Sequence, residues 1–136
     1  MPNHVYNVLE IHGEEKELKK FLKKNNGSPE QPLDFNKAVK MPKGYDQNSK
    51  WYKWAVKHWG TKWNAYDIEI TDDSKNGELI YRFQTAWSPP ENWLRKLAKK
   101  WKTLEIEMCF EEEARMYPDG KFIAKGRQFK ETKHKH

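Results

Sequence analysis

The chain has 136 residues, of which 36% are hydrophobic and 34% charged, with a formal net charge of +6 at pH 7. That length predicts one domain with a single core, and an aromatic content of 14% excludes an intrinsically disordered chain. No apolar run approaches the roughly 20 residues that cross a membrane, and Cys109 is the only cysteine, so we expect a cytoplasmic protein without membrane contact.

The positive charge is concentrated near the C-terminus. Residues 121–136 hold six Lys or Arg residues and one acidic residue, a net +5, which leaves +1 for residues 1–120. Basic ends of this kind are usually solvated. We therefore predict one domain over residues 1–130, followed by a disordered basic tail over residues 131–136.

The first part of the chain predicts a strand followed by a helix. The strand covers residues 5–12, which are rich in β-branched residues. The helix covers residues 14–25, because acidic residues occupy its first turn and lysines its last turn. Its apolar residues Leu18, Phe21 and Leu22 recur at helical spacing.

Residues 27–64 predict an irregular, partly helical insert that is rich in tryptophan. Within it, we expect a short helix over residues 49–59, with Ser49 as its N-cap and Gly60 in the left-handed position after its end. Five apolar residues of the insert are expected to pack on the core: Leu33, Phe35, Ala38, Val39 and Met41.

Two strands joined by a tight turn follow the insert. Residues 66–71 alternate between apolar and polar side chains, and Asn76-Gly77 is typical of a hairpin turn. The returning strand covers residues 79–87 and is predicted to direct Trp87 into the core.

A second helix and further strands complete the series. Ser88 is expected to cap a helix that Pro89 and Pro90 begin. The buried stripe of this helix consists of Trp93, Leu94, Leu97 and Trp101. A strand at residues 104–110 and an edge strand at residues 121–124 follow.

The predicted elements therefore run strand, helix, insert, strand, strand, helix, strand. This β-α-β-β-α-β order is typical of the ferredoxin-like α+β fold, in which two helices cover one face of an antiparallel sheet. The other face is then open to water, as the alternation of the strands requires.

Five short strings carry a family resemblance over about residues 1–113. They are Met1-Pro2-Asn3 with Asn7, Leu9, Ile11 and Gly13; Phe35-Asn36 with Met41-Pro42; Trp59-Gly60-Thr61-Lys62-Trp63; Ala65-Tyr66-Asp67; and Thr85-Ala86-Trp87-Ser88-Pro89-Pro90. On these strings the chain resembles the YubB-type ferredoxin-like domain family of phage and plasmid proteins. The resemblance implies a ferredoxin-like fold, a mobile-element origin and hence a host cytoplasm. It implies no catalytic residues.

Five of the seven tryptophans lie between residues 51 and 90. Such a cluster is a core, a binding surface or both. In the structural interpretation, Trp87, Trp93 and Trp101 pack a helix on the sheet, while Trp59 and Trp63 fold the insert over one end.

In the functional interpretation, part of the same cluster lines the mouth of a ligand site. The mouth would consist of His58, Lys62, Trp63, Thr85 and Trp87. Aromatic rings beside a cation suit a ligand with a flat ring and a phosphate group, such as a nucleotide.

The predicted helices carry many basic residues, and the open sheet face carries acidic ones. The acidic residues of that face are Glu10, Asp67, Glu69, Glu105 and Glu107. Their charge excludes base stacking on the sheet of the kind that RRM domains use. A polyanion would instead meet the helices or the tail through phosphate contacts. The candidate contacts are Lys19, Lys23, Arg95, Lys96, Lys99 and Lys100. Alternatively, these residues are ordinary solvated surface.

No motif in the sequence indicates catalysis. Cys109 has no His or Asn in a catalytic pattern, no H-E-x-x-H, P-loop or G-x-S-x-G string occurs, and we predict no metal and no cofactor. We therefore expect a non-enzymatic binding protein of phage or mobile-element type that engages a host macromolecule, such as a host protein, and interferes with host defence. The alternatives are a nucleic-acid or nucleotide binder and an unrecognised hydrolase. The sequence leaves the oligomeric state open.

Overall fold

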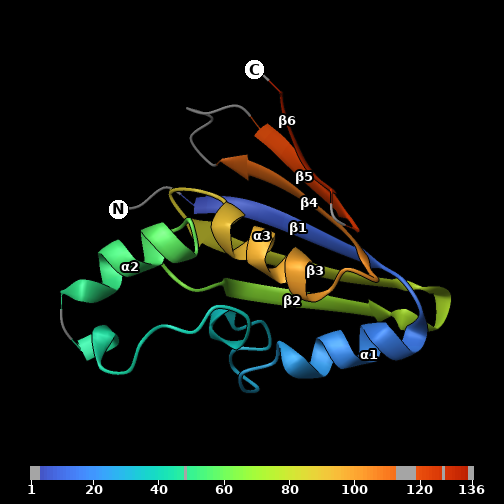
Figure 1. Ribbon diagram of the computed structural model, residues 1–136, viewed down its shortest axis with the longest axis horizontal. Helices are drawn as coiled ribbons and strands as arrows, with labels where there is room; N and C mark the ends of the chain where they lie inside the picture. The colour runs from blue at the N-terminus through green and yellow to red at the C-terminus, as the bar shows by residue number, and fades with distance from the viewer. Residues whose placement is uncertain (1–3, 48, 113–118, 127, 135–136) are drawn as a thin grey trace.

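The computed structural model describes residues 4–47, 49–112, 119–126 and 128–134 (Figure 1). Its strands are β1 (His4–His12), β2 (Tyr66–Asp73), β3 (Glu78–Ala86), β4 (Glu105–Glu112), β5 (Asp119–Lys125) and β6 (Gln128–His134). Its α-helices are α1 (Glu15–Lys24), α2 (Lys50–His58) and α3 (Glu91–Lys100). Short 3-10 helices cover Phe35–Lys37, Tyr45–Gln47 and Ser74–Asn76. No helix in these ranges is long and apolar enough to cross a membrane.

The six strands form one antiparallel sheet in the order β2-β3-β1-β4-β5-β6. β1 lies inside the sheet, where it pairs with β3 on one side and with β4 on the other. The ferredoxin-like, antiparallel arrangement is thus as predicted, but the sheet has six strands, where the sequence predicts four and an additional edge strand. β5 is not an edge strand, because β6 pairs along its full length.

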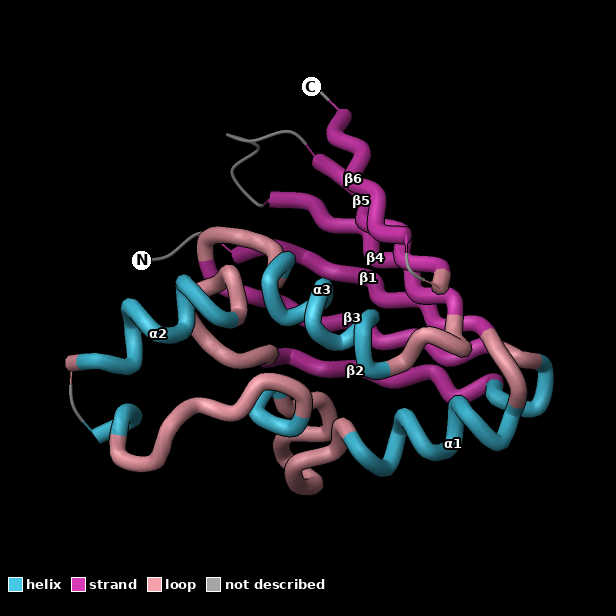
Figure 2. Tube along the Cα trace, viewed as in Figure 1, coloured by secondary structure: helices cyan, strands magenta, loops and turns pink. Residues whose placement is uncertain are grey.

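Helices α1 and α3 lie on the same face of the sheet, as predicted (Figure 2). Their apolar stripes reach one common core: Leu18 and Phe21 of α1 and Trp93 of α3 are fully buried. The ring of Phe21 meets the rings of Tyr81 in β3 and of Trp101, which follows α3, at centroid distances of 5.8 and 5.2 Å. The third helix, α2, belongs to the predicted insert.

The insert packs on the core through the residues that the sequence indicates. Leu33, Phe35 and Val39 are buried, and Ala38 and Met41 pack against them. The ring centroid of Phe35 lies 4.4 Å from that of Trp93 and 5.6 Å from that of Trp59. One aromatic cluster therefore holds the insert against α3.

Two predicted helix caps are wrong. The side chain of Ser49 makes no capping hydrogen bond at the start of α2. The Ser88 hydroxyl does not cap α3 but donates to the carbonyl oxygen of Gly60 at 2.6 Å, and Pro90 is the residue before the helix. Gly60 does take the left-handed conformation expected after α2, with φ of 84°.

The C-terminal end of the chain differs most from the prediction. Residues 131–134, predicted to lie in a disordered tail, belong to β6; residues 135–136 lie outside the described ranges. Phe129 of β6 packs on Phe122 of β5 at 5.6 Å between centroids, and the Arg95 guanidinium lies 4.1 Å from the centroid of Phe129. These contacts anchor the strand to the helix side of the sheet.

The open face of the sheet is less acidic than the sequence predicts. β5 brings Lys121 to 2.7 Å from Glu107 and Lys125 to 3.2 Å from Glu105, measured between ammonium nitrogen and carboxylate oxygen. Two lysines of β5 thus balance two of the predicted acidic residues.

Candidate binding surface

Three exposed aromatic rings surround the side chain of Lys62. Its Nζ atom lies 4.2 Å from the ring centroid of Trp87, 4.8 Å from that of Trp63 and 5.9 Å from that of Tyr52. The exposed fractions of Trp87, Trp63 and Tyr52 are 43%, 38% and 37%. An ammonium group over several ring faces is held by cation–π attraction. We call Tyr52, Lys62, Trp63 and Trp87 the aromatic platform.

Trp87 reaches the surface because the backbone turns at this residue. Its φ is 72°, which is a rare value for a bulky side chain. β3 ends one residue earlier, so the alternation that predicts an inward Trp87 no longer applies. The prediction that Trp87 packs in the core is therefore wrong.

A buried polar network holds this turn. The Thr85 hydroxyl donates to the carbonyl oxygen of Ser88 at 2.8 Å, and the Asn7 amide donates to the Thr85 hydroxyl oxygen at 3.1 Å. Asn7 and Thr85 are almost wholly inaccessible to solvent. Buried hydrogen bonds of this kind are stronger than those in water, so they stabilise the unusual backbone of Trp87.

The same turn is joined to the string that carries Lys62 and Trp63. The Thr61 hydroxyl donates to the carbonyl oxygen of Ala86 at 2.8 Å. The backbone N–H of Lys62 donates to that same oxygen at 3.5 Å. Two segments distant in the sequence therefore form one rigid support for the aromatic platform.

The structure brings together three of the five residues predicted for a ligand mouth. Lys62, Trp63 and Trp87 are neighbours on the platform. Thr85 lies beneath it and has no exposed surface. His58 points elsewhere: its ring stacks on Trp54 with centroids 4.8 Å apart.

His58 instead contacts α3. Its Nδ1 atom lies 3.3 Å from Nζ of Lys96. Partial burial, Lys96 and Lys57 all lower the pKa of His58. The neutral imidazole is thus favoured, and its contacts are those of a residue that packs α2 on α3.

Sequence reasoning missed Tyr52 and its neighbour Val56, which are both exposed on α2. Their i, i+4 spacing places them on one side of the helix, away from the buried Ala55. That spacing is the signal that would have identified them.

Two separate hollows border the platform. Lys62 and Trp63 line one hollow of about 320 Å³, together with Trp51 and Trp59. Trp87 lines another hollow of about 520 Å³ together with Val56. The platform residues thus face two hollows in place of the single mouth that the sequence predicts.

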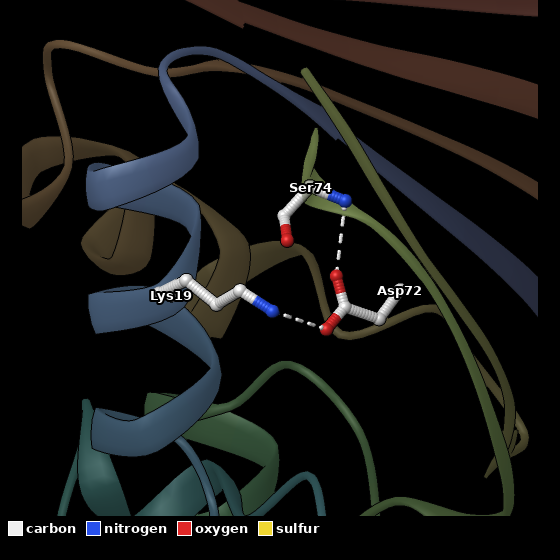
Figure 3. Close-up of polar contacts among 3 residues, drawn as sticks. All are labelled: Lys19, Asp72 and Ser74. Atoms are coloured by element: carbon white, nitrogen blue, oxygen red, sulfur yellow. Dashed lines mark hydrogen bonds and ion pairs between the residues drawn. The ribbon is translucent and has the colours of Figure 1, made fainter. Parts of the chain in front are cut away.

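The residues predicted to contact a polyanion have diverse surroundings. Nζ of Lys19 lies 3.0 Å from a carboxylate oxygen of Asp72, whose other oxygen accepts the Ser74 N–H at 3.0 Å (Figure 3). Nε of Arg95 lies 2.9 Å from the Glu91 carboxylate. These two cations are therefore already paired.

The other four residues predicted to contact a polyanion have no carboxylate partner among the described ion pairs. They are Lys23, Lys96, Lys99 and Lys100. Lys96 contacts His58, and Lys23 is exposed on α1. Lys99 and Lys100 line a common groove beside the end of α3. Among the described residues, the predicted contacts thus divide between two hollows that share Lys99: Lys100 lines one with it, and Arg95 lines the other.

The described residues show few candidates for catalysis or metal binding. Partial burial raises the pKa of the Cys109 thiol, which makes the reactive thiolate scarcer at neutral pH. The described ranges contain no group of three or more His, Cys, Asp or Glu side chains that could hold a metal ion.

Comparisons with known proteins address the fold. A family model described as "Ferredoxin-like domain in Api92-like protein" matches residues 59–136, which include Lys62, Trp63 and Trp87. The crystal structure of a protein api92 from Yersinia pseudotuberculosis is similar, with a TM-score of 0.53 and 17% sequence identity. The similarity covers 74% of this chain and 35% of that chain, so this chain spans about a third of its length. No curated protein matches the sequence.

Proposed function

We propose that this chain, which belongs to the family of ferredoxin-like domains in Api92-like proteins, is a non-enzymatic binding protein that engages a host protein through its aromatic platform. The observation that carries the proposal is the group of three exposed rings around Lys62. Trp and Tyr are enriched among residues that dominate the affinity of protein interfaces.

The rigid support of the platform favours this function. An exposed Trp87 with a left-handed backbone costs about 1–2 kcal/mol relative to an ordinary conformation. The Asn7–Thr85–Ser88 network offsets that cost and holds the ring in place before any partner binds. Little conformational entropy is then lost on association.

The charge of the platform indicates the chemistry of the partner. Lys62 is its only ionisable group apart from the Tyr52 hydroxyl. The complementary surface would therefore offer a carboxylate to Lys62 and apolar side chains to the three rings. The ion pair with Lys62 would orient the partner, and the apolar contacts would bury the surface of the three rings.

The proposal includes the origin and place of action of the protein. We assign it to the YubB type of phage and plasmid proteins, acting in the host cytoplasm by interfering with host defence. The support is the resemblance in the strings at residues 59–63 and 85–90. These strings meet through the hydrogen bonds from Thr61 to Ala86 and from Ser88 to Gly60.

Among the alternatives, nucleotide binding at the platform is less favoured by the geometry. Lys62 and Trp87 line different hollows, and the Lys62 ammonium already lies over the face of Trp87. A base stacked on that face would have to displace it. No arrangement in the described residues favours the hydrolase alternative.

Affinity capture from host lysate tests the proposal. The probe variant is Trp63→Ala/Trp87→Gly, in which glycine keeps the left-handed backbone without strain. The control is Tyr6→Ala, which removes an exposed ring on β1 that is not part of the platform. We expect at least one host protein to be retained by wild type and control and to fall at least tenfold with the probe variant.

The captured host protein is then purified, and its affinity for wild type, control and probe variant is measured by calorimetric titration. Circular dichroism establishes that the variants are folded. Equal retention by wild type, control and probe variant would contradict binding through the platform.

A further inference from the structure

A basic groove of about 570 Å³ lies where α1 and α3 end. Six lysines line it: Lys20, Lys24, Lys37, Lys99, Lys100 and Lys102. Glu17 is the only acidic residue among its lining residues. The net charge of the lining is therefore +5, which creates a strongly positive local potential.

These lysines differ from their neighbours in their charge partners. Lys19 and Arg95, on the same two helices, pair with Asp72 and Glu91. Within the described ion pairs, no carboxylate partner occurs for any of the six groove lysines. Six like charges in one groove repel one another, so the arrangement does not stabilise the fold by itself.

The helix dipole explains the positions of only three of the six groove lysines. Lys24, Lys99 and Lys100 occupy the last turns of α1 and α3, where a positive charge complements the helix dipole. Lys20 precedes the last turn of α1, Lys37 ends the 3-10 helix Phe35–Lys37, and Lys102 follows α3. Their convergence on the same groove is left unexplained by the dipole.

The groove has a fixed wall and an aromatic ring. Nζ of Lys100 donates to the carbonyl oxygen of Ala38 at 2.7 Å, which joins the insert to α3. The half-buried Trp101 lines the groove, and its ring meets Phe21 at 5.2 Å. Nζ of Lys24 lies 6.0 Å from the Trp101 centroid. Proteins that bind single-stranded nucleic acids commonly combine a positively charged groove with an aromatic ring on which a base stacks.

We propose that this groove binds the phosphate backbone of a single-stranded nucleic acid. The half-buried Trp101 ring offers a stacking partner to an unpaired base, which a duplex does not present, and the lysines are point charges without the forked geometry by which arginine reads guanine. Binding is therefore independent of base sequence. The site is separate from the aromatic platform and does not rest on the function proposed for it.

Fluorescence anisotropy with a 5′-labelled twelve-nucleotide oligo-dT tests the proposal. The groove variant is Lys37→Glu/Lys102→Glu, and both side chains are exposed, so the fold is preserved. The matched control is Lys75→Glu/Lys130→Glu, which changes the net charge equally at exposed sites outside the groove. We expect the groove variant to bind at least tenfold more weakly, and the control to stay within threefold of wild type.

The salt dependence gives a second readout. Each neutralised phosphate of a single strand contributes about −0.7 to the slope of log Kobs against log salt concentration, so six lysines give at most about −4. The groove variant should have a slope about 1.4 less negative than wild type. An unchanged slope would overturn the proposal.

Three further outcomes would also overturn it. Equal weakening in the groove variant and the control would show that only net charge matters. Displacement of the oligonucleotide by equimolar tripolyphosphate would identify a compact polyphosphate as the ligand. Equal affinity for a twelve-base-pair duplex would show that the groove does not prefer a single strand. The Trp63→Ala/Trp87→Gly variant should keep full oligonucleotide affinity, which separates this proposal from the one on the platform.

Discussion

Trp87 adopts a left-handed backbone conformation immediately after the last residue of β3. One torsion angle thus decides whether its ring joins the core or the surface. Alternation along a strand assigns a face only while the backbone stays extended. The cause of the turn lies in the hydrogen bonds of Asn7 and Thr85, and no local pattern around Trp87 reveals them.

Asp72 is the residue whose ionisation affects stability most clearly. The Ser74 hydroxyl and N–H, together with the Lys19 ammonium, lower its pKa to about 2. Of the two Ser74 groups, the N–H is the one in hydrogen-bond geometry, at 3.0 Å. Because this value is below the ordinary 3.8, the stabilisation is complete above pH 4 and is lost as the pH falls towards 2.

We therefore expect Asp72→Asn to lower the free energy of unfolding at pH 7 by about 1 kcal/mol or less, because the pair is exposed and screened by solvent. Between pH 4 and pH 2 the variant should lose less stability than wild type. Urea denaturation at several pH values measures both effects. Glu69→Gln, an exposed change on the same strand, is the control. If this variant also loses less free energy of unfolding than wild type between pH 4 and pH 2, the role of Asp72 is refuted.

At the scale of elements, the end of α2 meets the beginning of α3 at Gly60. Its φ of 84° requires a residue that tolerates the left-handed region. A Cβ at this position would lie 3.0 Å from the backbone nitrogen of Asn92 and 3.2 Å from that of Glu91. Glycine thus allows the two helices to approach closely.

Replacement of Gly60 by alanine should cost about 3 kcal/mol, of which about 1–2 kcal/mol is backbone strain and the rest is crowding against α3. Gly44→Ala provides the comparison. Its φ is 88°, but an added Cβ would meet no atom within 4 Å, so only the strain applies. Urea denaturation curves measure the difference, and equal losses in the two variants would show that α3 moves to accommodate the methyl group.

The elements with a regular apolar pattern could be predicted from the sequence. α1 and α3 show the helical spacing of Leu18, Phe21, Trp93 and Leu97, and all four are buried. β6 could not be predicted, because Phe129 is its single large apolar residue and its pairing with β5 is what makes it a strand. The basic groove was also missed in part, because Lys37 of the insert joins Lys99 and Lys102 only in three dimensions.

At the scale of the whole molecule, β5 and β6 extend the sheet beyond the four strands of the predicted fold. The extension is part of the core: Phe122 of β5 is fully buried, and its ring stacks on Phe110 with centroids 5.0 Å apart. Phe129 packs on the same ring. The basic C-terminal segment is thus structural up to the last described residue of β6.

We expect Phe129→Ala to lower the free energy of unfolding by about 2 kcal/mol, less than a fully buried phenylalanine would, because its ring is only partly buried. The contact with Arg95 is lost as well. Gln128→Ala, an exposed change in the same strand, should have little effect. Thermal and urea denaturation test this, and an unchanged stability of Phe129→Ala would mean that β6 does not contribute to the fold.

The central position of β1 has a consequence for the time course of folding. β2 pairs with β3, and β5 pairs with β6, so each of these four strands has a partner close to it in the sequence. β1 joins β3 to β4, which in turn pairs with β5, and its register matches His4 with Ala86 and Val5 with Glu112. Such distant pairings close long loops and slow folding to milliseconds or longer. We therefore expect the entry of β1 between β3 and β4 to be the rate-limiting event.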